Sequence, residues 1–198
     1  AEMLGGARRY RVLSVQRRGG TGHDVRRFHA THSWLPSRLE LEREEIHPDD
    51  PFERNLERLN DAAPDVVAGF GSYIGALYRF AHEHGRAIHV PKLVLHGGEQ
   101  LPAPDRELLA ATFGVRVRTS YQACEALRIA FECAPGGGLH VHADQVAVRI
   151  ADDAGRSLPP GESGQVVLSN LTNRATVLLN YAIGDTGALA TTPCACGR

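Results

Sequence analysis

Ser120-Tyr121-Gln122-Ala123-Cys124-Glu125-Ala126 is the stretch on which the interpretation of the fold depends, because two regions with different sequence patterns meet there. Before it, apolar segments alternate with helix-like segments. After it, a glycine-rich region of short β-like segments ends in paired cysteines. Chains built on parallel sheets bind ligands at the carboxyl ends of their strands. We therefore expect a ligand site at this stretch.

Upstream of this stretch, buried-strand patterns alternate with helix patterns across short turns. Asp50 before Pro51 is typical of a helix start, and Ser72 is expected to cap the next helix. This alternation predicts a parallel sheet with right-handed crossovers. The expected strands are Asp65 to Gly69, Lys92 to His96 and Val115 to Ser120, and the expected helices are Pro51 to Asn60, Tyr73 to His84 and Pro104 to Phe113.

The turns that follow the three predicted strands are Gly69 to Ser72, Gly97 to Gln100 and Tyr121 to Glu125. Parallel strands end at the same edge of a sheet, so these three turns are expected to emerge together. That edge is the usual ligand site of an open α/β fold.

The two ends of the chain differ from this middle region. Residues 1–50 are rich in arginine, with strand-like pieces at Tyr10 to Val15 and Arg38 to Leu41. After about Ala130, short strands separated by turn residues predict an antiparallel β-rich, barrel-like subdomain. These further strands are expected at Leu139 to His142, Gln145 to Ile150, Gly164 to Leu168 and Val177 to Tyr181. The fold class is therefore α/β, a doubly wound parallel sheet followed by a β-rich part, with domains at 1–50, 51–130 and 131–198.

The composition excludes some classes of partner. The 198 residues carry a formal net charge of −1, which gives no general attraction to nucleic acid or to an anionic membrane. No apolar run approaches the roughly 18 residues of a membrane span, and the first residues do not resemble a signal peptide. We expect a cytoplasmic protein that binds neither nucleic acid nor membranes, and a homodimer is compatible with this expectation.

Three motifs carry a family resemblance: Gly97-Gly98-Glu99, Tyr121-Gln122-Ala123-Cys124-Glu125 and Tyr181-Ala182-Ile183-Gly184-Asp185. In this order and spacing they resemble the adenylate-forming ligases, and the phenylacetate–coenzyme A ligase-like branch is the most similar. The likeness covers roughly residues 50 to 198. The same branch is also similar at Pro64 to Val67 with the Gly-Phe-Gly-Ser that follows shortly after, at Phe131 to Cys133, at Gly138 to His140 with Asp144, and at Pro193 to Arg198.

The resemblance implies a two-step reaction. A carboxylic acid, for which this branch favours aryl acids, attacks the α-phosphate of ATP to give an acyl-adenylate and pyrophosphate. A thiol of coenzyme A or of a carrier protein then takes the acyl group and releases AMP. The phosphate loop and the small C-terminal domain of such enzymes are not found in the sequence, so we expect this chain to be one part of the enzyme, inactive or weakly ATP-binding alone. Candidates to line the acid pocket are Phe70, Gly71, Ser72 and Tyr73.

The resemblance also assigns roles in nucleotide binding. Gly97, Gly98 and Glu99 would pack against adenine, since glycines allow the backbone to approach a flat ring. Tyr121 would stack on the other face of the ring. Glu125 would hold Mg²⁺, although an acidic residue also suits the first turn of a following helix. Asp185 would accept hydrogen bonds from both ribose hydroxyls.

Three residues depart from the family pattern. Cys124 stands where a threonine usually contacts the α-phosphate, and a thiol is a poor donor, which leaves a nucleophilic role open. Gln122 replaces a glycine and either bonds adenine or fills space, and Asn180 replaces an arginine. These departures support an alternative, in which the chain is a non-catalytic, zinc-stabilised module that binds a nucleotide or a protein and derives from a ligase scaffold.

The four cysteines point to a metal rather than to disulfides in a cytoplasmic chain. Cys133 and His140 flank a glycine-rich turn, and Cys194 and Cys196 follow the predicted β-subdomain. Three thiolates and one imidazole form a typical structural zinc set. His142, on the same strand face as His140, is the substitute ligand.

Overall fold

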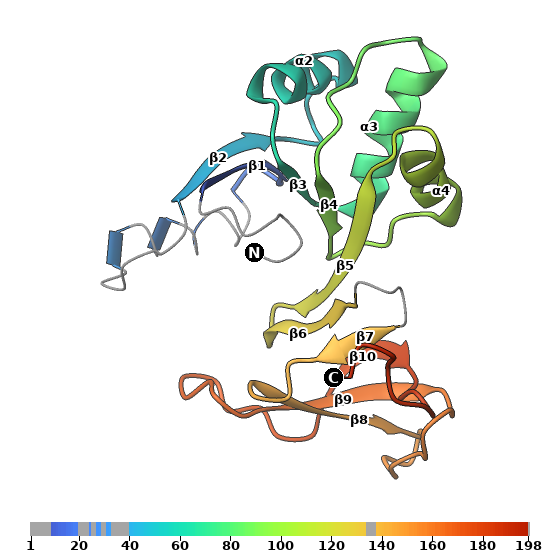
Figure 1. Ribbon diagram of the computed structural model, residues 1–198. Helices are drawn as coiled ribbons and strands as arrows, with labels where there is room; N and C mark the ends of the chain where they lie inside the picture. The colour runs from blue at the N-terminus through green and yellow to red at the C-terminus, as the bar shows by residue number, and fades with distance from the viewer. Residues whose placement is uncertain are drawn as a thin grey trace. The chain divides into compact units, whose positions relative to one another are not determined.

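The computed structural model describes residues 9–19, 24, 27–28, 31–32, 40–133 and 138–197 (Figure 1). The chain divides into two compact units, Ala1–Val117 and Arg118–Arg198, and the division falls within strand β5 (Arg116–Ala123). Each unit is described separately below.

The first unit contains the predicted parallel sheet. Its strands are β1 (Arg9–Val15), β2 (Glu40–Ile46), β3 (Val66–Gly69) and β4 (Leu93–His96), in the order β2-β1-β3-β4, with β5 next in order. The pairs β1–β2, β1–β3 and β3–β4 are all parallel. The α/β prediction is thereby confirmed.

Strand β2 is longer than its sequence suggested. Only a piece ending at Leu41 was expected, because the run Glu42 to Glu45 is almost entirely charged and lacks a strand pattern. In the structure all seven residues of β2 pair with β1, from Arg9↔Glu40 to Val15↔Ile46. Pairing with a neighbouring strand, rather than local propensity, therefore sets the end of β2.

Among the described residues of this unit, the helices that connect the strands are α2 (Phe52–Ala62), α3 (Gly71–Glu83) and α4 (Ala103–Ala111). Helices α3 and α4 lie side by side in Figure 1. Within the described part of the chain, no helix has the length and apolar character needed to cross a membrane.

Both predicted helix caps were wrong. The N-cap of α2 is Pro51 and that of α3 is Phe70, and neither helix has a side-chain cap. The carboxylate of Asp50 accepts two hydrogen bonds of 2.8 Å from Arg18, and Ser72 lies inside α3. A guanidinium fork offers a carboxylate a stronger, charge-assisted bond than a main-chain amide does.

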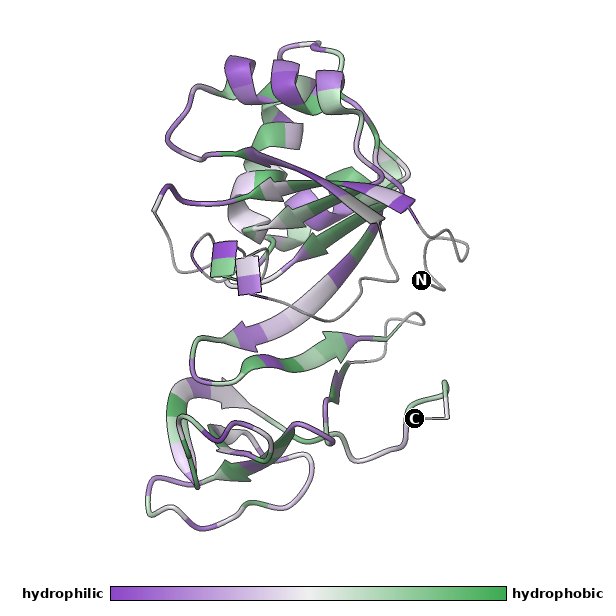
Figure 2. Cartoon of the chain, turned by 90° about the vertical axis from the view of Figure 1, so that its left-hand side faces the viewer, coloured by the Kyte–Doolittle hydropathy of each residue, from purple (hydrophilic) through white to green (hydrophobic). Residues whose placement is uncertain are grey.

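The core of the first unit lies between the helices and the sheet. Figure 2 shows the hydrophobic residues gathered there. Fully buried side chains come from both the helices and the strands, and the aromatic residue Tyr78 is among them. Its principal members are Leu13, Val15, Leu56, Leu59, Ile74, Leu77, Tyr78, Val94 and Leu109.

The second unit is antiparallel throughout, as predicted. Strands β5, β6 (Leu127–Glu132) and β7 (Leu139–Val141) pair as a meander. Strands β8 (Val146–Ala151), β9 (Gly164–Asn170) and β10 (Tyr181–Gly187) form a separate sheet in the order β10-β9-β8.

Two expectations for this unit are corrected. No helix follows Glu125, because β5 continues to Ala123 and the chain turns directly into β6. The last strand begins at Tyr181, where the expected strand ended. Strand β6 had no recognised pattern, and its pairing with β5, Ser120↔Phe131 to Ala123↔Leu127, defines it.

Candidate functional site

The carboxyl edge of the first unit's sheet brings together residues from three turns. Glu99 follows β4, and its carboxylate accepts a hydrogen bond from the hydroxyl of Ser72, which follows β3. Arg17, after β1, lies with its Nη2 3.4 Å from the other oxygen of Glu99. The main-chain amide of Gly97 donates to the carbonyl of Gly69 at 3.0 Å, which ties the β3 and β4 turns together.

Two positions at this edge require glycine, each for a different reason. A Cβ on Gly71 would lie 2.6 Å from the main-chain nitrogen of Leu101, a distance that real Cβ atoms do not adopt. Gly98 has a φ of 76°, and a Cβ there would contact the ring of Phe70 at 3.6 Å. The Gly97-Gly98 turn thus runs close to the Phe70 ring, with backbone geometry that favours glycine.

Arg17 is the residue of this edge that the sequence analysis did not single out. Its guanidinium carbon lies 5.5 Å from the centre of the Phe70 ring, in a cation–π arrangement. The available signal was its position directly after the strand-like segment Tyr10 to Val15, since a parallel strand there also ends at the ligand edge.

Tyr73, the fourth predicted pocket residue, packs toward α2 instead. Its hydroxyl accepts a 2.6 Å hydrogen bond from the buried side chain of Asn55. Its ring centre lies 5.4 Å from that of Phe52. Burial raises the pKa of Tyr73. These contacts give Tyr73 a role in holding α3 against α2.

In the second unit, Tyr121 and Asp185 form the central pair of the candidate nucleotide site. The Tyr121 hydroxyl donates a 2.6 Å hydrogen bond to Oδ2 of Asp185, although 64 positions separate the two residues. Burial, followed by this hydrogen bond and the charge of Asp185, raises the pKa of Tyr121. The phenol is therefore protonated at neutral pH and acts as the donor.

The other residues of the tyrosine motif lie at the end of the β5–β6 hairpin. The amide nitrogen of Gln122 donates to the hydroxyl of Ser120 at 2.9 Å, and Cys124 is exposed. The carbonyl of Glu125 accepts a 3.0 Å hydrogen bond from the side chain of Asn170. The negative charge of Glu125 also contributes to the raised pKa of Tyr121, after burial, the hydrogen bond to Asp185 and the charge of Asp185.

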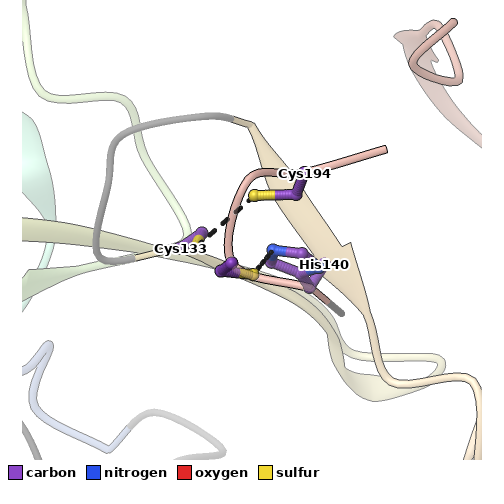
Figure 3. Close-up of side chains that lie close together, drawn as sticks. Cys133, His140 and Cys194 are labelled. Atoms are coloured by element: carbon purple, nitrogen blue, oxygen red, sulfur yellow. Dashed lines mark hydrogen bonds between the residues drawn. The ribbon is translucent and has the colours of Figure 1, made fainter. Parts of the chain in front are cut away.

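The predicted zinc ligands come together in the second unit. Cys133 directly follows β6, His140 lies on β7, and Cys194 lies opposite them near the end of the chain (Figure 3). Cys196 follows two residues after Cys194. The ligand atoms of these four residues all lie within 4.8 Å of one another. His142 does not belong to the group, and its ring lies 5.0 Å from that of Phe131.

The distances within this group fit a tetrahedral zinc ion. The sulfurs of Cys133 and Cys194 are 3.7 Å apart, and the Cys196 sulfur is 3.3 Å from Nε2 of His140. Zn–S bonds of about 2.3 Å and a Zn–N bond of about 2.0 Å predict tetrahedral edges of roughly 3.8 and 3.5 Å. Burial and the neighbouring thiols raise the pKa of Cys133 to about 11, so a cation is needed to hold it as a thiolate.

The predicted adenine turn and the Tyr121–Asp185 pair belong to different units. Gly97, Gly98 and Glu99 lie in Ala1–Val117, whereas Tyr121 and Asp185 lie in Arg118–Arg198. Each set is brought together within its own unit by contacts between residues that are distant in the sequence.

The fold is that of the acyl–coenzyme A ligases. It superimposes with a TM-score of 0.79 on 2-hydroxyisobutyryl-CoA ligase in the postadenylation state in complex with R3-HIB-AMP, at 18% identity, covering 100% of this chain and 43% of that chain. The anthranilate CoA ligase AuaEII in complex with anthranoyl-AMP gives a TM-score of 0.63 at 16% identity, over 83% of this chain and 32% of that one.

The amino-acid sequence is similar to that of one particular coenzyme A ligase. The chain is 29% identical over 153 residues to the phenylacetate-coenzyme A ligase of Thermus thermophilus, which is 74% of this chain and 34% of that enzyme. It therefore spans about a third of the length of this relative. No protein-family model matches the chain. The predicted resemblance to the phenylacetate–coenzyme A ligase-like branch of the adenylate-forming ligases is confirmed.

Proposed function

We propose that this chain is part of an enzyme that activates a carboxylic acid with ATP as an acyl-adenylate and transfers the acyl group to coenzyme A. The observation that carries this proposal is the 2.6 Å hydrogen bond between Tyr121 and Asp185. The family motifs assign both residues to one nucleotide, and folding brings them into contact across 64 positions. The likeness to a coenzyme A ligase over 153 residues supports it independently.

In the proposed site, Asp185 accepts hydrogen bonds from the ribose and the ring of Tyr121 stacks on adenine. Glu125 holds Mg²⁺ beside the phosphates, because a carboxylate supplies the oxygen ligands that Mg²⁺ prefers. Gln122 and Cys124 belong to the same tyrosine motif, on and just after β5. Catalysis would come from positioning and from charge stabilisation.

For the acid, we propose an aryl substrate that contacts Phe70 and the backbone at Gly71. An aromatic ring beside a glycine turn offers a flat apolar surface, and the Phe70 ring is only partly buried. The resemblance to a phenylacetate-specific enzyme supports this choice. Coenzyme A is preferred over a carrier-protein thiol because the ligases similar to this chain are coenzyme A ligases.

We also propose that Cys133, His140, Cys194 and Cys196 bind one structural zinc ion. Four protein ligands close the coordination sphere, which is typical of a structural rather than a catalytic site. When bound, the ion would supply the positive charge that keeps the buried Cys133 as a thiolate. The four residues would then fasten the last turn of the chain to β7 and the end of β6.

Isothermal titration calorimetry of the 198-residue chain with AMP tests the nucleotide site. Binding is expected, and Asp185→Ala should weaken it roughly tenfold or more, the effect of losing hydrogen bonds to a charged acceptor. The matched control is Asp153→Ala, an exposed aspartate in the turn after β8, which should bind AMP like the original chain. Equal affinity in Asp185→Ala, or no binding at all, would contradict the proposal.

The second candidate is a non-catalytic binding module that the zinc ion stabilises. The specific observation in its favour is Cys124, an exposed thiol in place of the hydroxyl that contacts the α-phosphate in this family. For a module of this kind that binds a protein, AMP would leave the melting temperature unchanged while a zinc chelator would lower it. For the ligase, both additions would change it, in opposite directions.

A further inference from the structure

Asp185 lies on an irregular part of β10. Ala182 pairs with Val167 of β9 and Thr186 pairs with Gln165, so three residues of β10 stand opposite one residue of β9. Gly184, in this bulge, has a φ of 88°. Bulges of this kind redirect side chains and are frequent beside active sites. Here the bulge carries Asp185, whose side chain is exposed, toward β5.

An exposed carboxylate on a bulge has no fixed direction unless a neighbour holds it. Tyr121 is suited to do this because it is itself fixed: it pairs with Ala130 in the β5–β6 hairpin and packs against the second unit's core. Ile183, two residues before Asp185, packs against the same core. The bulge is thus anchored by Ile183 and by the hydrogen bond between Tyr121 and Asp185.

We infer that the Tyr121 hydroxyl is a positioning group that orients Asp185 for ribose recognition, and that it thereby sets the preference for ribonucleotides. This inference rests on the proposed function. The phenol occupies one lone pair of Oδ2, which leaves Oδ1 and the second lone pair of Oδ2 to accept from the two ribose hydroxyls. The ring of Tyr121 can stack on adenine without its hydroxyl, so the two roles are separable.

Tyr121→Phe separates them, because it keeps the ring and removes the donor. The ligands are AMP and 2′,3′-dideoxy-AMP, which lacks both ribose hydroxyls, and the quantity measured is the ratio of their dissociation constants. In the original chain AMP should bind at least roughly tenfold more tightly, as expected for hydrogen bonds to a charged acceptor. In Tyr121→Phe the ratio should fall about fivefold or more, while the affinity for the dideoxy ligand stays within about twofold.

The controls distinguish positioning from a general structural role. Tyr181→Phe makes the same change at the second unit's other tyrosine, which is 40% exposed, and should leave the ratio unchanged. In an Asp185→Ala background, Tyr121→Phe should have no further effect on the ratio, because it acts through Asp185. If Tyr121→Phe does not fold, Asp185→Glu, which moves the carboxylate on an exposed side chain, should lower the ratio in the same way.

Three results would overturn the inference. One is a Tyr121→Phe variant whose ratio of dissociation constants is unchanged with both affinities intact, or an unchanged ratio in Asp185→Glu where Tyr121→Phe does not fold. Another is an equal loss of affinity for both ligands in Tyr121→Phe. Either leaves the proposed function standing as long as the original chain binds AMP. The third is an original chain that binds neither ligand, which removes the proposed function and the inference together.

Discussion

Removal of zinc from the proposed site at Cys133, His140, Cys194 and Cys196 should destabilise the second unit. The sulfurs of Cys133 and Cys194 lie 3.7 Å apart, close to the edge of roughly 3.8 Å that a zinc–thiolate tetrahedron requires. All four ligand atoms lie within 4.8 Å of one another, so one zinc ion could contact all of them after small shifts of the side chains. At a free zinc concentration of about 100 times the dissociation constant, binding stabilises the folded unit by about 2.7 kcal/mol.

The size of the second unit converts this energy into a temperature. For a domain of about 60–100 residues, each kcal/mol changes the melting temperature by roughly 4–8 °C. Chelation should therefore lower the melting temperature of Arg118–Arg198 by about 10–20 °C, measured by differential scanning calorimetry of the whole chain. The purified protein should contain one zinc per chain by elemental analysis.

Two matched pairs of variants sharpen the zinc prediction. Cys194→Ser should lose zinc, whereas Cys124→Ser, at an exposed cysteine outside the cluster, should retain it. His140→Ala should lose zinc and His142→Ala should keep it. Substoichiometric zinc in the original chain, or a melting temperature that a chelator leaves unchanged, would refute the reasoning.

Three further predictions concern the first unit. Gly71→Ala places a Cβ 2.6 Å from the main-chain nitrogen of Leu101 and should lower the free energy of unfolding by about 1–3 kcal/mol in a urea titration. Tyr78→Phe removes the 2.9 Å hydrogen bond to the carbonyl of His89 and should cost about 1–3 kcal/mol in the same assay, because that carbonyl loses its donor. A main-chain amide of β1 and then a lysine lower the pKa of Asp65. Its stabilising effect is therefore complete above the unfolded pKa of about 3.9 and is lost as the pH falls through the lower folded value, so Asp65→Asn should flatten the pH dependence of unfolding below about pH 4.

Features that depend on short stretches of chain could be predicted from the amino-acid sequence. Strands β3 and β4 were predicted nearly to the residue, because compact apolar runs bounded by turn residues report local structure directly. The same local logic selected Cys133, His140, Cys194 and Cys196 as a metal set, since thiolates and imidazole are the ligands that zinc prefers.

Contacts between side chains that are distant in the sequence could not be predicted in this way. Tyr121 was expected to stack on adenine, and nothing in the sequence indicated that its hydroxyl donates a hydrogen bond to Asp185. Asp50 was expected to cap a helix, and a guanidinium 32 positions away binds it instead. Arg17, to which the sequence analysis gave no role, lies beside Phe70 and Glu99. Each of these contacts joins residues that are far apart in the chain, and no pattern within a short window records them. The physical reason is that strand pairing and charge-assisted hydrogen bonds form only once the fold has brought the partners together.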